Sequence, residues 1–281
     1  MTICSAGISK EGVIIVSDCR VTYGNLFSDS LVKTYPLTES SSLSFAGNID
    51  CAKFIITHLN GKHLTRYANE GIYKLLKHTA KQIRRLYIKY SQQRVNCYVS
   101  FLLTGCSKRG CWIGSCESPK FKLSLTNNLF AVRTIGDYES GKKAVNKAMI
   151  HAVSSNFSGN NLVMLAGTSV DGALNLTYIE KYKDRDQEHG VSGLLILFKN
   201  SDKGLEIIEY KAEMFRGRIA DRNKALGYAA TNSVEFDATL NKFRLHNHQT
   251  GKSNILSDIY SFNNQKRGVI NTNFDPYKLN G

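Results

Sequence analysis

The sequence has no apolar run long enough to cross a membrane as a helix. Its longest clear run, LLILF at 194–198, has the length of a strand, whereas a spanning helix needs about 18 apolar residues or more. The first residues also lack a basic head followed by a long apolar core, and Asp18 interrupts them early, so we expect no secretion signal. Hydrophobic residues make up 42% of the chain and charged residues 21%, which is typical of a soluble protein with a sizeable core. We therefore expect a cytoplasmic protein.

The sequence also lacks a Cys-x2-Cys pair, the usual beginning of a zinc site. An odd number of cysteines without an export signal predicts reduced thiols. The spacing of the last three leaves a metal site as an alternative, but FLLTGCSKRGCWIGSC is more typical of two strands joined by the turn SKRG. We expect neither a metal nor another cofactor. The seven cysteines are Cys4, Cys19, Cys51, Cys97, Cys106, Cys111 and Cys116.

Acidic residues are few compared with basic ones. The chain has 23 Asp and Glu against 37 Lys and Arg, which gives a formal net charge of +14. The densest basic stretch, YKLLKHTAKQIRRLYIKY, has its charges at helical spacing opposite an apolar stripe, so we expect an amphipathic helix over about 70–92. Its charged side is either a solvated face or a surface for a polyanion or an acidic protein. We expect no membrane partner and no nucleic acid.

The order of the expected elements does not follow the βαβ alternation of a doubly wound parallel fold, and we find no internal repeat. Strands at both ends of the pattern enclose helices, which favours an α+β protein with antiparallel sheets and helices packed outside them. Asp50 is the expected N-cap of a helix with the sequence CAKFIITHLN. Further helices are expected at 70–92 and 139–156, and strands at 97–105, 110–115, 128–135, 162–167, 173–180, 193–199 and 205–210.

The end of the chain differs in composition from the rest. We expect one domain over 1–215, followed over 216–281 by a C-terminal helix and an Asn-rich polar extension that is an appendage or partly disordered. TGKS at 250–253 lacks the first glycine of a phosphate loop, because His246 occupies that position. His246 and His248 have no further ligands beside them, so we expect no metal there.

The first residues, MTICSAGISK, place a threonine directly behind Met1. Thr2 is either the end of a strand or a nucleophile. A hydroxyl is a weak nucleophile that needs a base, and the free amine of an N-terminal threonine, with an ordinary pKa of about 7.7–8.0, can be that base. This chemistry requires removal of Met1.

A threonine nucleophile needs a lysine that lowers its hydroxyl pKa, a carboxylate that holds the lysine, and a backbone N–H for the oxyanion. Asp18 ends the expected strand GVIIVSD, Lys33 lies in SLVKTY and Gly47 lies in SFAGN. All three lie at ends of expected strands, where they can converge on Thr2.

The segments MTIC, GVIIVSDCRVTYGN, LVK and SFAGN together resemble the start of proteasome β-type subunits, the N-terminal nucleophile hydrolases that include the HslV peptidase. Within this superfamily the chain is most similar to the bacterial Anbu group. TIGDYESGKKAV at 134–145 and TSVDGALNLTYIE at 168–180 resemble segments of that group, the second as a strand entry. The resemblance covers about 2–215.

The resemblance implies a four-layer αββα sandwich and assigns a role to each matching residue. The implied roles are nucleophile for Thr2, acid for Asp18, lysine for Lys33, oxyanion donor for Gly47, framework residue for Arg20 and support of the amine for Ser169. The acidic residue that the family places just upstream of the supporting serine has no clear match.

The resemblance also implies a threonine peptidase that acts on peptides or unfolded proteins and self-associates into a ring or an open spiral. It leaves a partner ATPase open. A non-peptidase amide hydrolase that uses the same threonine is one alternative. Another alternative is a subunit for assembly or binding that has weak catalytic activity or none. In such a subunit the basic helix would matter more than Thr2.

Overall fold

The structure is a computed structural model. It describes residues 3–18, 20–23, 26–29, 33–38, 40–59, 61–92, 97–136, 139–182, 195–208, 232–237, 242–247 and 251–255.

The first of two stacked sheets is built around the N-terminal hairpin. Its strand order is β10-β1-β2-β11-β12, and every neighbouring pair is antiparallel. Every residue of β1 and β2 is buried, which explains why GVIIVSD is a nearly continuous apolar run rather than an alternating one. The strands are β1 (Ile3–Ser9), β2 (Gly12–Asp18), β10 (Val132–Gly136), β11 (Leu195–Ser201) and β12 (Gly204–Ile208).

The second sheet has the order β5-β6-β7-β8-β9 and is also antiparallel. Its strands are β5 (Thr34–Thr38), β6 (Ser41–Gly47), β7 (Val99–Ser107), β8 (Gly110–Glu117) and β9 (Ser124–Thr126). A separate hairpin, β3 (Arg20–Tyr23) and β4 (Leu26–Asp29), lies between β2 and β5 in the chain.

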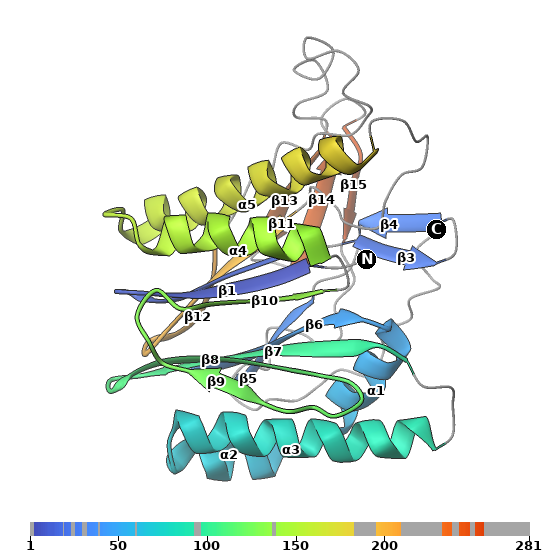
Figure 1. Cartoon of the computed structure of the whole chain (residues 1–281), viewed down its shortest axis with the longest axis vertical. Coiled ribbons are helices and arrows are strands. Elements are labelled where there is room, and N and C mark those ends of the chain that lie inside the picture. The colour runs from blue at the N-terminus through green and yellow to red at the C-terminus, as the bar shows by residue number, and fades with distance from the viewer. Residues whose placement is uncertain are drawn as a thin grey trace.

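Helices cover the outer faces of both sheets, so the molecule has the order helix, sheet, sheet, helix (Figure 1). The helices α4 (Glu139–Val153) and α5 (Gly159–Tyr182) pack on the first sheet. The second sheet is covered by α1 (Ile49–His58), α2 (Gly61–Asn69) and α3 (Ile72–Ser91). This arrangement confirms the expected α+β class and the four-layer αββα sandwich.

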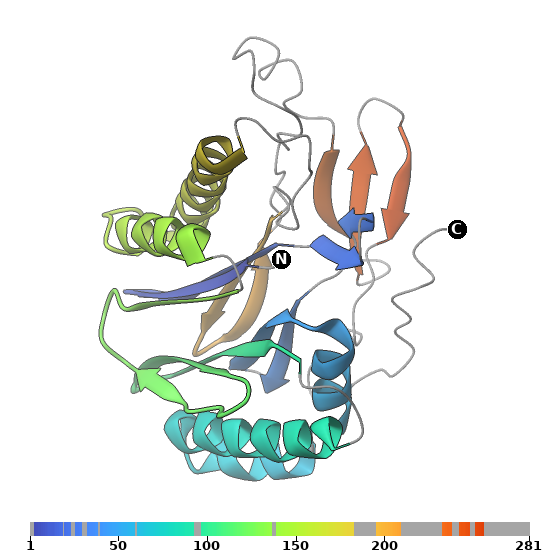
Figure 2. The same ribbon diagram turned by 45° about the vertical axis from the view of Figure 1, so that its right-hand side comes forward.

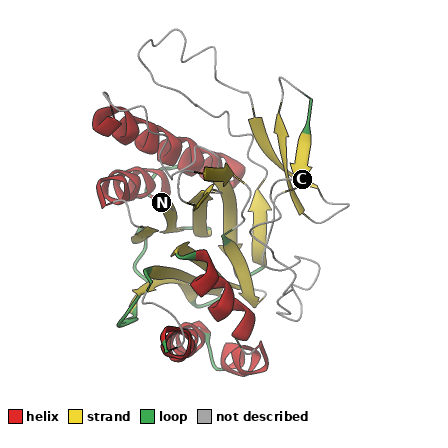
Figure 3. Ribbon diagram, turned by 90° about the vertical axis from the view of Figure 1, so that its right-hand side faces the viewer, coloured by secondary structure: helices red, strands yellow, loops and turns green. Residues whose placement is uncertain are grey.

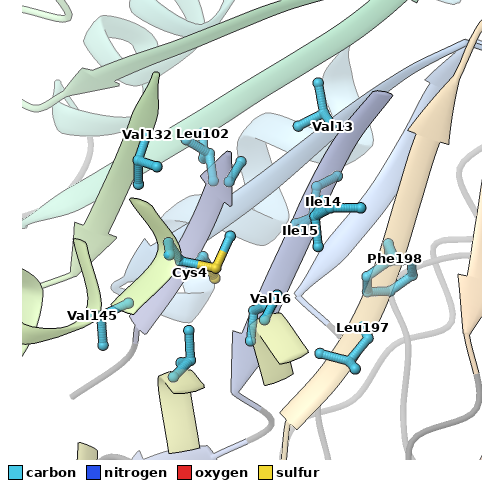
Figure 4. Close-up of a cluster of buried hydrophobic side chains, with 14 of the residues drawn as sticks. Cys4, Val13, Ile14, Ile15, Val16, Leu102, Val132, Val145, Leu197 and Phe198 are labelled. Carbon is cyan, nitrogen blue, oxygen red and sulfur yellow. The ribbon is translucent and has the colours of Figure 1, made fainter. Parts of the chain in front are cut away.

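The larger hydrophobic core joins three of the four layers. Side chains of β1 and β2, such as Cys4 and Ile15, lie between Val145 of α4 and Leu102 of the second sheet (Figure 4). A second core fills the space between the other sheet and α1–α3, where Phe45 and Phe101 are completely buried. The two cores hold the strand ends of both sheets in fixed positions.

The strands expected at 162–167 and 173–180 are wrong, because 159–182 forms the single helix α5. Its buried residues Leu162, Val163, Ala166, Val170 and Leu174 recur at helical spacing and face the first sheet. The short apolar runs NLVML and ALNL suit either structure when taken alone. The resemblance of 168–180 to a strand entry therefore does not hold in the structure.

Two local expectations in the second helical layer also need correction. Asn48, not Asp50, is the N-cap of α1, since its Oδ1 accepts a hydrogen bond of 2.9 Å from the N–H of Cys51, and Asp50 lies in the first turn. The helix α2 was not expected, and it precedes the predicted long helix α3.

The expectation that every cysteine is a reduced thiol is wrong in one place. Cys106 of β7 lies directly opposite Cys111 of β8, and the two form a disulfide. Cys4, Cys51, Cys97 and Cys116 are free thiols. Among the described residues, no group of three or more His, Cys, Asp or Glu side chains has the arrangement of a metal site.

Near the end of the chain, β13 (Asn232–Asp237), β14 (Lys242–Asn247) and β15 (Ser253–Ile255) form a small antiparallel sheet of their own. It lies outside the sandwich (Figures 2 and 3). Part of the expected polar extension is thus strand. The helix expected after 216 lies outside the described residues, and the boundary at 215 stays a prediction.

Within the described part of the chain, no helix combines the length and apolar character that crossing a membrane requires.

The β1–β2 turn is tied to α5 by Glu11. Its carboxylate accepts hydrogen bonds from the N–H of Gly159, at 3.0 and 2.9 Å, and forms an ion pair of 2.8 Å with Lys199 of β11. These contacts lower the pKa of Glu11, with the Lys199 hydrogen bond as the largest cause. A negative charge at the first turn of α5 also interacts favourably with the helix dipole.

We expect Glu11→Gln to lower the free energy of unfolding by about 1 kcal/mol at pH 7, because it weakens one charged hydrogen bond and the helix-end interaction. Because the folded state lowers the pKa of Glu11, the contribution is present above its unfolded value. It is lost as the pH falls through the folded value. Urea unfolding at pH 7 and pH 3 measures this. Glu70→Gln, which removes the exposed pair with Lys74, is the matched control and should cost less than about 0.5 kcal/mol. Equal losses in both variants would contradict the role given to Glu11.

Candidate active site

The ends of β1 and β2 meet at the carboxylate of Asp18. Asp18 is the last residue of β2 and is completely buried. Its Oδ1 accepts a hydrogen bond of 3.0 Å from the N–H of Ile3, the first residue of β1. On the other side, the register pairs Asp18 with Leu195, the first residue of β11. The carboxylate thus lies at the edge where three strands of the first sheet begin or end.

Lys33 brings a positive charge to the same oxygen. Its Nζ lies 3.0 Å from Asp18 Oδ1, and the two side chains are 1% and 0% exposed. The carbonyl of Lys33 accepts a hydrogen bond of 3.1 Å from the N–H of Phe45, which fixes the lysine to β6 of the second sheet. Burying an ion pair this completely costs desolvation energy and adds little stability. Buried charges of this kind cluster at functional sites, where they shift the pKa of neighbouring groups.

Opposing effects act on the ionisation of Asp18. Burial raises the pKa of its carboxyl, whereas the charge and hydrogen bond of Lys33 and the N–H of Ile3 lower it. Its second oxygen, Oδ2, is buried and has no hydrogen-bond partner among the described residues.

Hydroxyl and thiol groups surround the pair between the two sheets. The Thr34 hydroxyl lies 2.8 Å from that of Ser44 and donates to that of Ser17 at 3.4 Å. The Cys4 thiol donates to the carbonyl of Phe45 at 3.4 Å. Burial strongly raises the pKa of Cys4, so it remains a protonated thiol and is not a reactive nucleophile.

Gly47 ends β6 at the start of α1 in a conformation that favours glycine. Its φ is +99°, and a Cβ at this position would lie 2.5 Å from the carbonyl oxygen of Tyr98. That same oxygen accepts a hydrogen bond of 2.8 Å from the N–H of Asn48. A tight, glycine-dependent bend just before a helix is the kind of backbone that can present an N–H to an oxyanion.

Tyr98 connects the two sheets beside this bend. Its phenol donates hydrogen bonds of 3.3 Å to the carbonyl of Gly136 and to Glu117. Gly136 pairs with Ile3 in the register of β10 and β1. Tyr98 was not predicted as a site residue, because an isolated tyrosine ahead of a strand carries no recognisable signal.

A hollow of about 600 Å³ opens next to Tyr98. Its walls include Ser115 and Glu117 of β8, Thr134 of β10 and Lys142 of α4. It offers room for part of a bound chain beside the end of β1.

The structure therefore brings three of the six expected residues into one region. Asp18 and Lys33 are in contact, and Gly47 ends β6, the strand to which the backbone of Lys33 is hydrogen-bonded. Thr2 lies outside the described residues, as does the side chain of Arg20, whose backbone begins β3 opposite Asp29. Ser169 lies within α5, and its role in supporting the amine stays a prediction.

Comparison with known proteins agrees with this geometry. The model of the proteasome subunit family matches residues 2–118, a span that includes Asp18, Lys33, Gly47 and Tyr98. No relative was found among curated proteins. Residues 2–118 are thus similar to the proteasome subunit family, and the chain has a four-layer αββα sandwich of the kind found in N-terminal nucleophile hydrolases.

Proposed function

We propose that this chain is a threonine-type peptidase subunit of a self-assembling, proteasome-like complex, with Thr2 as the nucleophile after Met1 is removed. One observation carries the proposal: Asp18 Oδ1 accepts from both the N–H of Ile3 and Nζ of Lys33. The buried acid–lysine pair is thus hydrogen-bonded to the residue that directly follows Thr2. The family match supports a peptidase in general terms.

Strand geometry supports the same assignment. Side chains alternate along a strand, and Cys4 lies on the face of β1 that is turned to the second sheet. Cys4 faces Phe45 of the second sheet, two residues before Gly47. The face of β1 that carries Cys4 is therefore turned toward the strand that ends at Gly47.

In the proposed reaction, Thr2 Oγ attacks the substrate carbonyl and its proton passes to the Thr2 amine. The charge of Lys33, held by Asp18, lowers the pKa of the hydroxyl, and the N–H of Gly47 stabilises the oxyanion. The peptide C–N bond then breaks, and the leaving amine takes the proton. Water hydrolyses the remaining ester and restores Thr2.

The closer likeness to the Anbu group, self-association into a ring or open spiral and a cytoplasmic location are also parts of this proposal. A partner ATPase stays open. Incubating Met1-free protein with unfolded casein and sequencing the products by mass spectrometry tests the activity. Internal peptide cleavage supports a peptidase. Hydrolysis of small amides alone would support the amide hydrolase, and no turnover of either would support a silent subunit.

Tyr98 is the positioning residue that the structure adds to this site. We expect Tyr98→Phe to lower kcat about 5- to 20-fold, because the lost phenol no longer links the Gly47 bend to the strand beside Ile3. KM should change less than about twofold, since phenylalanine keeps the ring that lines the hollow and only the hydrogen bonds of the phenol are lost. Steady-state kinetics on a fluorogenic peptide, with thermal melting as a check, measures this. Tyr73→Phe, at an exposed tyrosine of α3, is the control. A rise in KM with unchanged kcat would contradict the positioning role.

A further inference from the structure

We propose that a pocket on the outer face of α1–α3 is a docking site for an acidic segment of another protein. This surface lies on the opposite side of the second sheet from the first sheet and its Asp18–Lys33 pair (Figure 1). The proposal does not depend on the peptidase function.

The exposed face of α3 carries a basic ridge formed by Lys74, Lys77, Lys81, Arg84, Arg85 and Lys89. The helix contains no Asp or Glu, and at 1.5 Å per residue the ridge is about 22 Å long. Among the described residues, its one ion pair joins Lys74 to Glu70, at the N-terminal end.

Repulsion between the like charges of this ridge destabilises the isolated helix. Lys77, Lys81, Arg85 and Lys89 follow one another at intervals of four residues, the spacing at which like charges repel along a helix. A solvated face is normally built from charges of both signs. The ridge instead has the single sign that is expected where an anionic partner supplies the compensating charge.

The middle of the ridge borders a pocket of about 390 Å³. Lys81 and Arg85 are exposed and form its basic rim. Gln82 and Leu86, which directly follow them in the sequence, also line the pocket and are half-buried. None of the described residues that line it is acidic. A carboxylate could therefore pair with the rim while a neighbouring aliphatic side chain contacts Leu86.

Tyr67 and His78 make the other wall and indicate which polyanion fits. Their rings are stacked, with centroids 3.5 Å apart and planes 8° from parallel. Single-stranded nucleic acid binds by stacking its bases on exposed aromatic faces, but one face of Tyr67 is already covered by His78. Burial and the neighbouring lysines lower the pKa of His78, so the fixed charge comes from Lys81 and Arg85.

The mixed polar and apolar lining favours a peptide with acidic and aliphatic residues. A second copy of this chain is a poor occupant in a symmetric contact, because each copy would present the same basic ridge to the other. The occupant we infer is therefore an Asp- and Glu-rich segment of a different protein.

The test is the binding of a fluorescein-labelled (Asp-Leu-Glu) repeat peptide to the full chain, followed by fluorescence anisotropy at low salt. Use of the Thr2→Ala chain prevents cleavage of the probe, so failure of the peptidase proposal cannot affect the result. We expect the acidic peptide to bind and its neutral (Asn-Leu-Gln) counterpart not to bind. Lys81→Ala combined with Arg85→Ala should weaken binding at least about tenfold.

The matched control is Lys143→Ala combined with Lys147→Ala on α4. It removes the same charge at the same spacing from another layer, and should change the affinity less than about twofold. Circular dichroism and melting verify that both variants fold. The proposal would be overturned if the acidic peptide did not bind at millimolar concentrations of the chain. Equal weakening by both double variants, or tighter binding of single-stranded oligothymidine than of the peptide, would also overturn it.

Discussion

Replacing Thr2 by alanine should reduce peptide hydrolysis at least about 10³-fold in kcat, because none of the described hydroxyls or thiols at the site has an N-terminal amine as its base. The Cys4 thiol lies beside the pair, but burial raises its pKa and keeps it protonated. Alanine retains the backbone, so the hydrogen bond from Ile3 to Asp18 and the thermal stability should be unchanged. Initial rates on a fluorogenic peptide measure the effect.

Thr2→Ser is the matched control for this variant. It keeps a hydroxyl and an N-terminal amine and should retain a substantial part of the activity. Residual activity of Thr2→Ala close to that of the unchanged chain would mean that another group attacks the substrate.

Replacing Lys33 by methionine should lower the free energy of unfolding by about 3–5 kcal/mol, because Asp18 is then a buried charge without its cation. Methionine has a similar shape, so loss of packing is a minor part of the effect. Activity should also fall to background, since no positive charge then lowers the hydroxyl pKa of Thr2. Urea denaturation and peptide hydrolysis measure the two effects.

The double variant Asp18→Asn with Lys33→Met separates stability from chemistry. It removes both buried charges and leaves an amide oxygen for the N–H of Ile3, so most of the lost stability should return. Activity should stay at background. Lys199→Met breaks a more exposed pair, 17% and 32% accessible, and should cost only about 1 kcal/mol without loss of activity. A double variant that is both stable and active would contradict the role of the pair.

The parts of the site that the sequence predicts are those where local pattern and chemistry agree. Asp18 ends a continuous apolar strand, Lys33 precedes the next one, and Gly47 lies between a strand and a helix. Each position is therefore fixed by an element boundary that the sequence marks. The absence of βαβ alternation predicts antiparallel sheets with helices outside them, whereas the four-layer order is implied by the resemblance to proteasome β-type subunits.

The parts that were missed depend on contacts between segments far apart in the chain. The helix α5 was predicted as strands because its short apolar runs suit both periods, and only the first sheet selects the helical face. Tyr98 has a role because its carbonyl lies against Gly47 and its phenol reaches Gly136. The Cys106–Cys111 pair is the consequence of a strand register that composition does not specify.

The most direct test of the account is intact and tandem mass spectrometry of the chain after treatment with a peptidyl β-lactone. The account predicts that the Met1-free chain gains one acyl group and that the modified fragment begins with Thr2. Chain that retains Met1, and the Thr2→Ala variant, should gain none, because they lack either the free amine or the hydroxyl. An acyl group on any other residue, or none on Met1-free chain that is correctly folded and assembled, would contradict the assignment of Thr2 as the nucleophile.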